Sequence, residues 1–104
     1  MKLNKSSKTV KRLSKNSLEN QASLFKCMGD PTCLKILYLL SGEDEVCVSD
    51  IAETMDVSLS AVSHQLSKLK SMGILETVRK GQSICYSFSG GKRADLVRKL
   101  LITN

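Results

Sequence analysis

The residues best suited to binding chemistry gather on one side of the segment 58–72. Leu59, Val62, Leu66 and Leu69 recur at helical spacing, so small hydroxyls, an imidazole and an ammonium group share the opposite side. A helix that needs only solubility usually carries Glu and Lys there, because serine competes for the backbone and lowers helix propensity. Hydroxyl, imidazole and ammonium groups instead bond phosphates and base edges. The pattern predicts a helix that contacts DNA.

The candidate contacts on this helix lie on its polar side and along the edges of that side. Lys68, like Lys70, carries a cation suited to a backbone phosphate. His64 is the single histidine, and no thiol or carboxylate stands three or four residues from it, so we assign it to DNA rather than to a metal. A solvated polar face is the alternative. The full set of expected contacts is Ser58, Ser60, Ala61, Ser63, His64, Gln65, Ser67 and Lys68.

Among the four cysteines, Cys47 has the best position for thiol chemistry. It lies at or near the start of an expected helix, where unpaired amides and the helix dipole lower the pKa of a thiol. The acidic run 43–45 opposes that effect. We predict Cys47 as a candidate ligand for a thiophilic metal or as a redox group, with a plain helix cap as the alternative.

The other three cysteines are weaker redox candidates. Cys27 and Cys33 flank the break at 29–31 and could approach each other to form a shared site, although cysteine is also a common core residue. Cys85 alternates away from its apolar neighbours, so we expect it to be half exposed and without a partner. Since there is no CxxC pair and no export signal, we do not expect a disulfide framework. A thiolate site formed by cysteines of two subunits is a further alternative.

An enzyme active centre is not expected. The chain has one histidine, no Ser-His-Asp grouping that spacing supports, no glycine-rich phosphate loop and no paired carboxylates in an apolar setting. Thiol chemistry and nucleic-acid binding are therefore the classes that the residues favour.

Two expected strands follow the polar helix. Residues 74–78 and 83–88 have strand composition, and the second alternates apolar and polar residues. The connection 79–82 carries two cations, so the hairpin resembles a wing whose tip contacts backbone phosphates or the minor groove. The candidate contacts in this connection are Arg79, Lys80 and Gln82.

The remaining segments read as helices that position this pair of elements. We expect a first helix from an N-cap at Ser17 to Met28, and a central core helix that Asp30 caps and Pro31 begins. A further helix lies within 46–55, and a short break separates it from the polar helix, as in a helix-turn-helix. The last helix, 94–102, has an apolar stripe that a second subunit would cover. The expected fold is mainly α: about five helices plus one β-hairpin wing, in a homodimer.

Charge is distributed unevenly along the 104 residues. Residues 1–15 carry six bases and no acid, and 58–93 carry six bases against one acid, a net of +5, whereas 41–57 carry six acids and no base. A polyanion would be attracted to the first two regions. We divide the chain into a flexible basic arm, 1–16, and one domain, 17–104. With no long apolar run and no leader, we expect a cytoplasmic protein without membrane contact.

Residues 24–88 resemble the ArsR/SmtB family of winged-helix transcriptional repressors. The resemblance rests on four motifs that occur in the family's order: residues 24–37 around Gly-Asp-Pro-Thr, 45–52 around Cys-Val-Ser-Asp, 57–69 around Ser-His-Gln-Leu, and 81–88. It implies a homodimer, packed through the first and last helices, that binds a near-palindromic operator on double-stranded DNA and is released by an inducer.

This sequence departs from the family pattern at its metal sites. Many members carry Cys-Val-Cys-Asp where this chain has Cys47-Val-Ser49-Asp50, so one of the two thiolates is absent. The zinc site on the last helix of other members needs His and carboxylate ligands, but residues 92–104 hold only Asp95. Cys33 stands where the family usually has Arg.

We therefore predict a homodimeric, sequence-specific repressor released by a thiophilic metal, a metalloid or a thiol-modifying species. One alternative is a regulator of the same fold that is switched by oxidation or persulfide, or that has no ligand. The other is a winged-helix protein-interaction module whose basic arm binds an acidic partner.

Overall fold

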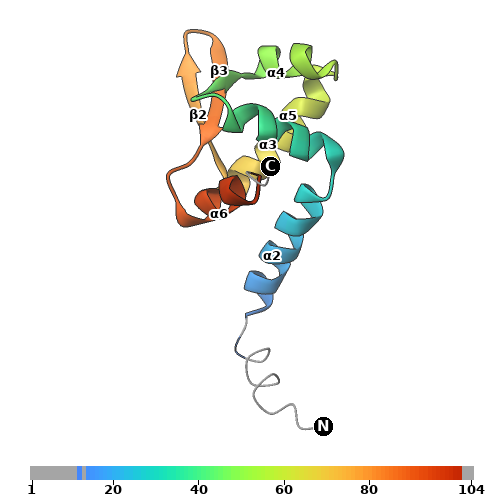
Figure 1. The fold of residues 1–104 in the computed structure, drawn as a ribbon, viewed down its shortest axis with the longest axis vertical. Helices are drawn as coiled ribbons and strands as arrows, with labels where there is room; N and C mark the ends of the chain where they lie inside the picture. The colour runs from blue at the N-terminus through green and yellow to red at the C-terminus, as the bar shows by residue number, and fades with distance from the viewer. Residues whose placement is uncertain (1–11, 13, 102–104) are drawn as a thin grey trace.

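A computed structural model describes Arg12 and residues 14–101 of the chain. It confirms a mainly α, winged-helix architecture: the described part holds five helices and a small antiparallel sheet, which lies at one edge of the molecule (Figure 1). The expected arm, 1–16, lies mostly outside the described residues. The elements are α2 Lys15–Met28, α3 Pro31–Ser41, β1 Val46–Cys47, α4 Val48–Met55, α5 Leu59–Ser71, β2 Leu75–Lys80, β3 Ser83–Phe88 and α6 Lys92–Leu101.

The core is aliphatic and centred on α3, as the apolar run of that helix predicts. Ile36, Leu37 and Leu40 are fully buried, and α3 contacts α2, α4, α6 and β3. Burial of one such side chain stabilises the fold by about 1.5–3 kcal/mol. Helices α4 and α5 pack against each other and against this core, which makes the helix-turn-helix a rigid unit.

Capping residues set most helix starts. The Asp30 carboxylate accepts from the Thr32 amide at 2.9 Å, and the Ser58 hydroxyl accepts from the Ala61 amide at 3.2 Å, as expected. The expected N-cap at Ser17 is wrong. Ser14 caps α2 instead, because its hydroxyl accepts from the Ser17 amide at 3.0 Å and the helix begins three residues earlier.

The sheet has the order β1-β3-β2 and differs from the expected hairpin in two ways. Lys80 pairs with Ser83, so the tip is the two-residue loop 81–82, and Arg79 and Lys80 lie in β2 rather than in a connection. Gly81, with φ +62°, permits that tight turn. The start of the expected helix, Val46–Cys47, is instead strand β1, which pairs with β3.

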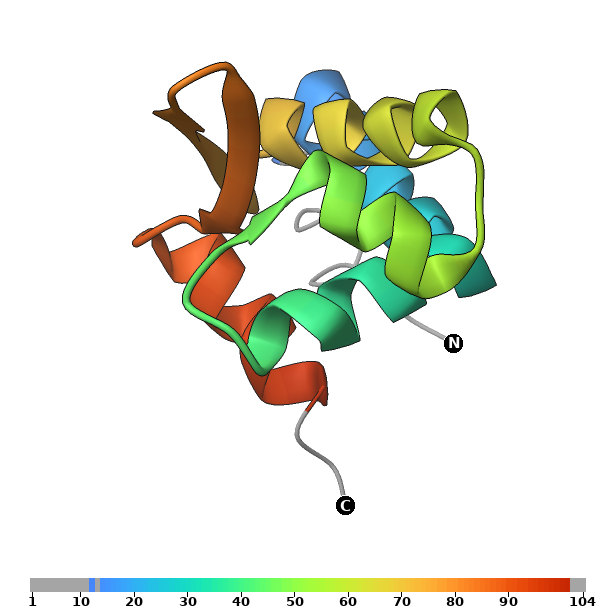
Figure 2. The same cartoon turned by 90° about the horizontal axis from the view of Figure 1, so that it is seen from above.

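The views place α5 and the hairpin side by side along one edge of the molecule (Figure 2), and α5 contacts β2. Helix α2 extends away from the body (Figure 1). Among the described helices, none is both long and apolar enough to cross a membrane.

Candidate nucleic-acid interface

Helix α5 turns its polar side outward. Val62, Leu66 and Leu69 are fully buried. Leu59, expected to face the core with them, is 55% exposed, because the first turn of α5 lies beyond the edge of the core. The exposed candidate contacts are Ser58, Ser60, Ala61, His64, Ser67 and Lys68, while Ser63 is half-buried.

Both ends of α5 are held by hydrogen bonds. Ser58 caps its start. At its end, the Arg93 guanidinium of α6 donates to the Met72 carbonyl at 3.0 Å, and the Ser89 hydroxyl donates to the Gly73 carbonyl at 2.6 Å. The loop after the wing and the first turn of α6 therefore fix the orientation of α5. Arg93 has no motif that would have revealed this role in the sequence.

The hairpin lies beside α5, and its polar residues are exposed. Arg79, Lys80 and Gln82 are exposed, and Lys80 forms an ion pair with Glu45. A cleft of about 290 Å³ separates α5 from the wing, and Ser63 and Gln82 line it from opposite sides. We call the exposed polar residues of α5 and of the hairpin the α5–wing face.

Gln65 differs from the other candidates on α5. Its amide nitrogen donates to the Asp30 carboxylate at 3.0 Å, and its amide oxygen accepts from the Cys27 thiol at 3.9 Å. The side chain is thus engaged at the junction of α2 and α3 and is not free for DNA.

The structure pairs Cys47 with Cys85 in a disulfide between β1 and β3. This corrects two expectations, since Cys85 is fully buried rather than half exposed and has a partner. The cause is the register, which sets the two residues directly opposite each other. Cys47 also precedes α4 as its N-cap residue but makes no capping bond through its side chain. Because the two cysteines are 38 residues apart, no local sequence pattern predicts their pairing.

Cys27 and Cys33 do come together, as their positions around the break indicate. Their sulfurs lie 2.8 Å apart in the core. Burial raises the pKa of the Cys33 thiol, and the Cys27 thiol and the Asp30 charge raise it further against an opposing effect of Lys68. Cys33 is therefore a neutral thiol at physiological pH.

The donor set does not fit a metal centre of the family's cysteine-pair type. Cys47 is bonded to Cys85, and the position two residues further is Ser49. Within the described residues, no three His, Cys, Asp or Glu side chains gather closely enough to hold a metal ion.

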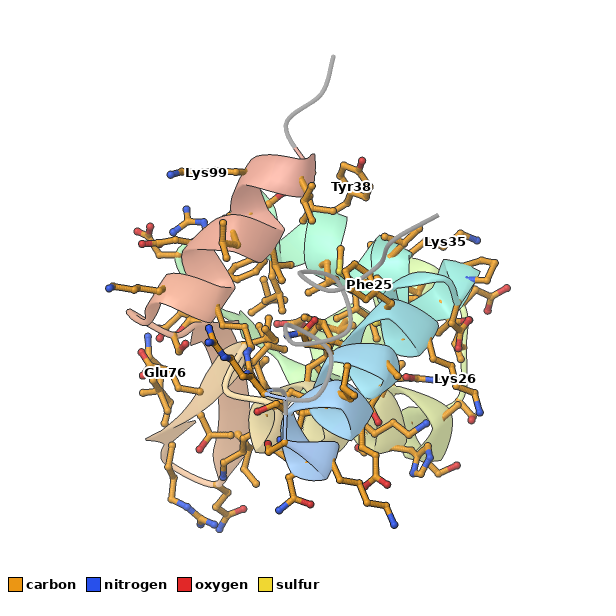
Figure 3. The ribbon with its side chains drawn as sticks, turned by 90° about the horizontal axis from the view of Figure 1, so that it is seen from below. Phe25, Lys26, Lys35, Tyr38, Glu76 and Lys99 are labelled. Atoms are coloured by element: carbon orange, nitrogen blue, oxygen red, sulfur yellow. A yellow bond between two sulfur atoms is a disulfide. The ribbon has the colours of Figure 1, made fainter. Side chains whose placement is uncertain are left out.

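A second exposed surface is apolar. Helices α2 and α6 border a groove of about 730 Å³, here called the α2/α6 groove. Figure 3 shows Phe25 on the side of α2 that faces α6, and Lys26 on the opposite side. Its apolar lining is Leu24, Phe25, Met28, Leu96, Val97 and Leu100.

A helix-turn-helix with an exposed polar second helix, followed by a two-stranded hairpin, defines a winged-helix DNA-binding domain. The family model described as "Bacterial regulatory protein, arsR family" matches residues 30–77. The cadmium resistance transcriptional regulatory protein CadC homolog of Staphylococcus aureus is 35% identical over 98 residues, which are 94% of this chain and 81% of the relative.

Two further comparisons agree with this match. The transcriptional repressor SdpR of Bacillus subtilis is 39% identical over 79 residues, 76% of this chain and 87% of the relative. The homodimeric winged helix-turn-helix DNA-binding domain of Mb0332 from Mycobacterium bovis has a TM-score of 0.70 and 28% identity, covering 86% of this chain and 84% of that one. The chain belongs to the ArsR family, and it is a DNA-binding transcriptional repressor rather than an enzyme.

Proposed function

We propose that two copies of this chain bind an inverted-repeat operator in the cytoplasm, with each α5 in the major groove and each hairpin against flanking phosphates. The observation that carries this proposal is the α5–wing face, which exposes hydroxyls, an imidazole and cations on α5 and on the hairpin that contacts it. The proposed contacts are Ser58, Ser60, Ala61, Ser63, His64, Ser67, Lys68, Arg79, Lys80 and Gln82. Gln65 is left out because its amide is engaged by Asp30.

The α2/α6 groove supports homodimer formation. Phe25, Leu96 and Leu100 are 65%, 63% and 56% exposed, an unusual share of large apolar side chains for one groove of a small domain. A second copy would cover them and set the two α5 helices about 34–36 Å apart, one turn of DNA. The solved homodimer of the Mycobacterium bovis relative supports this arrangement.

The basic arm, 1–16, and the domain, 17–104, have separate roles in this proposal. The arm adds charge that neutralises phosphates outside the contacted grooves. The domain supplies all base contacts.

We further infer that a thiol-directed inducer releases the operator. Two relatives are named as regulators of cadmium or arsenic resistance, and both elements bind thiols, which supports this inference. This chain offers the free thiol pair Cys27 and Cys33, while Cys47 is bonded to Cys85, which favours thiol modification over metal coordination at Cys47.

Selection of bound sequences from random duplex DNA tests the proposal, repeated with arsenite, Cd(II), Zn(II) or hydrogen peroxide. We expect an inverted repeat whose half-sites lie about one helical turn apart, and weaker recovery with at least one of these agents. Recovery of no inverted repeat would refute operator binding and favour a protein-interaction module.

A further inference from the structure

The junction between α2 and α3 holds a pair of buried thiols. Cys27 lies in the last turn of α2 and Cys33 in the first turn of α3, and their sulfurs are 2.8 Å apart. We propose that Cys27 and Cys33 form an oxidation site, in which a hydroperoxide converts the two thiols to a disulfide that weakens operator binding. This inference rests on the proposed function and assigns its regulatory site.

The separation of the sulfurs favours disulfide formation over metal binding. A disulfide needs about 2.05 Å between the sulfurs, so the pair has to close by less than 1 Å. Two thiolates on one tetrahedral Zn²⁺, each about 2.3 Å from the metal, stand roughly 3.8 Å apart, so the buried pair would have to open by about 1 Å. The close packing of the core around the fully buried Cys33 resists that expansion.

A cavity gives a small oxidant access to one of the two sulfurs. Cys27 is 6% exposed and lines a cavity of about 330 Å³, whereas Cys33 is fully buried behind it. The charged residues Lys26, Lys68 and Asp30 also line this cavity. Cys27 is therefore the sulfur that meets the oxidant, and Cys33 resolves the product.

The reaction balances in two steps. The Cys27 thiolate attacks one oxygen of the hydroperoxide, so a sulfur–oxygen bond forms, the oxygen–oxygen bond breaks, and the other oxygen leaves as an alcohol or water after taking a proton. The sulfur of Cys33 then attacks the Cys27 sulfenic acid. The sulfur–sulfur bond forms, and the hydroxyl leaves as water with the proton of the Cys33 thiol. The two sulfurs lose two electrons and the peroxide gains them.

The link from this site to DNA binding passes through Gln65. Asp30, between the two cysteines, caps α3 with one carboxylate oxygen and accepts from Gln65 of α5 with the other. Oxidation removes the Cys27 thiol proton that is donated to the Gln65 oxygen and draws α2 toward α3. Lys68, one turn further along α5, lines the same cavity. A changed junction therefore alters the angle of α5 relative to α2, and with it the fit of two α5 helices to two half-sites.

The test compares reduced and peroxide-treated full-length protein on the selected duplex, with binding followed by fluorescence anisotropy and disulfides mapped by mass spectrometry without reduction. We expect a peptide pair joined through Cys27 and Cys33, a loss of affinity of about 10-fold or more, and recovery with dithiothreitol. Cys33→Ala keeps the Cys27 thiol and its bond to Gln65, so it should bind like the reduced protein and lose the response to peroxide. Cys27→Ala should also lose the response to peroxide, whatever its affinity in the reduced state. The matched control, Cys47→Ala with Cys85→Ala, should keep the loss of affinity on peroxide treatment.

Two outcomes separate this inference from the proposed function. A Cys27–Cys33 disulfide that leaves affinity unchanged, or a response that persists in Cys27→Ala or Cys33→Ala, refutes the switch while operator binding stands. Reduced protein that binds no selected duplex refutes the proposed function instead. If either alanine variant unfolds, the mapped disulfide and the dithiothreitol reversal in the unmodified chain decide the question.

Discussion

The α5–wing face and the α2/α6 groove are both exposed, but they differ in chemistry. The first presents hydroxyls and cations that water already solvates well, so it needs no permanent cover. The second presents Phe25, Leu96 and Leu100, whose exposure to water costs free energy until another apolar surface covers them. The two exposed faces thus indicate two kinds of partner: a polyanion that binds reversibly, and a second copy of the chain that stays bound.

The largest expected effect comes from placing a charge in the apolar α2/α6 groove. Leu96→Asp places a charge in the apolar lining of the α2/α6 groove, so we expect sedimentation velocity to show a monomer. Operator affinity should fall by about 100-fold or more, because two linked half-site contacts become independent. Leu96→Met keeps the side chain apolar and should remain dimeric. A monomer that binds the operator undiminished would show that the two faces do not act together.

Charge reversal on the α5–wing face should weaken DNA binding without changing dimer formation. Lys68→Glu is expected to weaken operator binding by roughly 10-fold near 0.1 M salt and to lower the salt slope by about 2 for the dimer, with the dimer intact. Lys35→Glu makes the same change on α3, outside this face, and serves as the control. Equal effects of the two variants would mean that only overall charge matters.

A smaller effect is expected at the wing. Arg79→Ala removes one exposed cation from β2, so affinity should fall by about 3-fold and the salt slope by roughly 1 per subunit in contact. Glu76→Gln, on the same strand, should not weaken binding. Salt-dependent anisotropy titrations measure both, and an unchanged slope for Arg79→Ala would remove the wing from the interface.

The smallest expected change tests how separate the two faces are. Arg93 lines the α2/α6 groove and also donates to the carbonyl at the end of α5. Arg93→Ala should cost about 1 kcal/mol of stability, a fall in Tm of about 4–8 °C by thermal unfolding, with affinity reduced by less than the Lys68 reversal. Lys92 lines the same groove but does not make that bond, so Lys92→Ala serves as the control. If both variants shift Tm equally, Arg93 has no special role at α5.

Sequence patterns predicted the helices well where local signals were strong. The N-caps at Asp30 and Ser58 and the stop at Gly73, whose φ is +79°, act within one turn of the chain. The start of α2 was misplaced because Ser14 and Ser17 are both capping residues, and only the hydrogen bond distinguishes them. Strand β1 was missed because two residues are too few to show a period of two.

The sequence by itself determined the winged-helix architecture and the polar side of α5, because helical period, caps and turn residues are local properties. It also placed Cys27 and Cys33 near each other, since only a short break separates their helices. Only the tertiary structure decided that Cys47 faces Cys85, that Gln65 turns inward to Asp30, and that Arg93 holds the end of α5. These contacts join residues 38, 35 and 21 positions apart, and strand register and helix packing, which no local pattern encodes, bring them together.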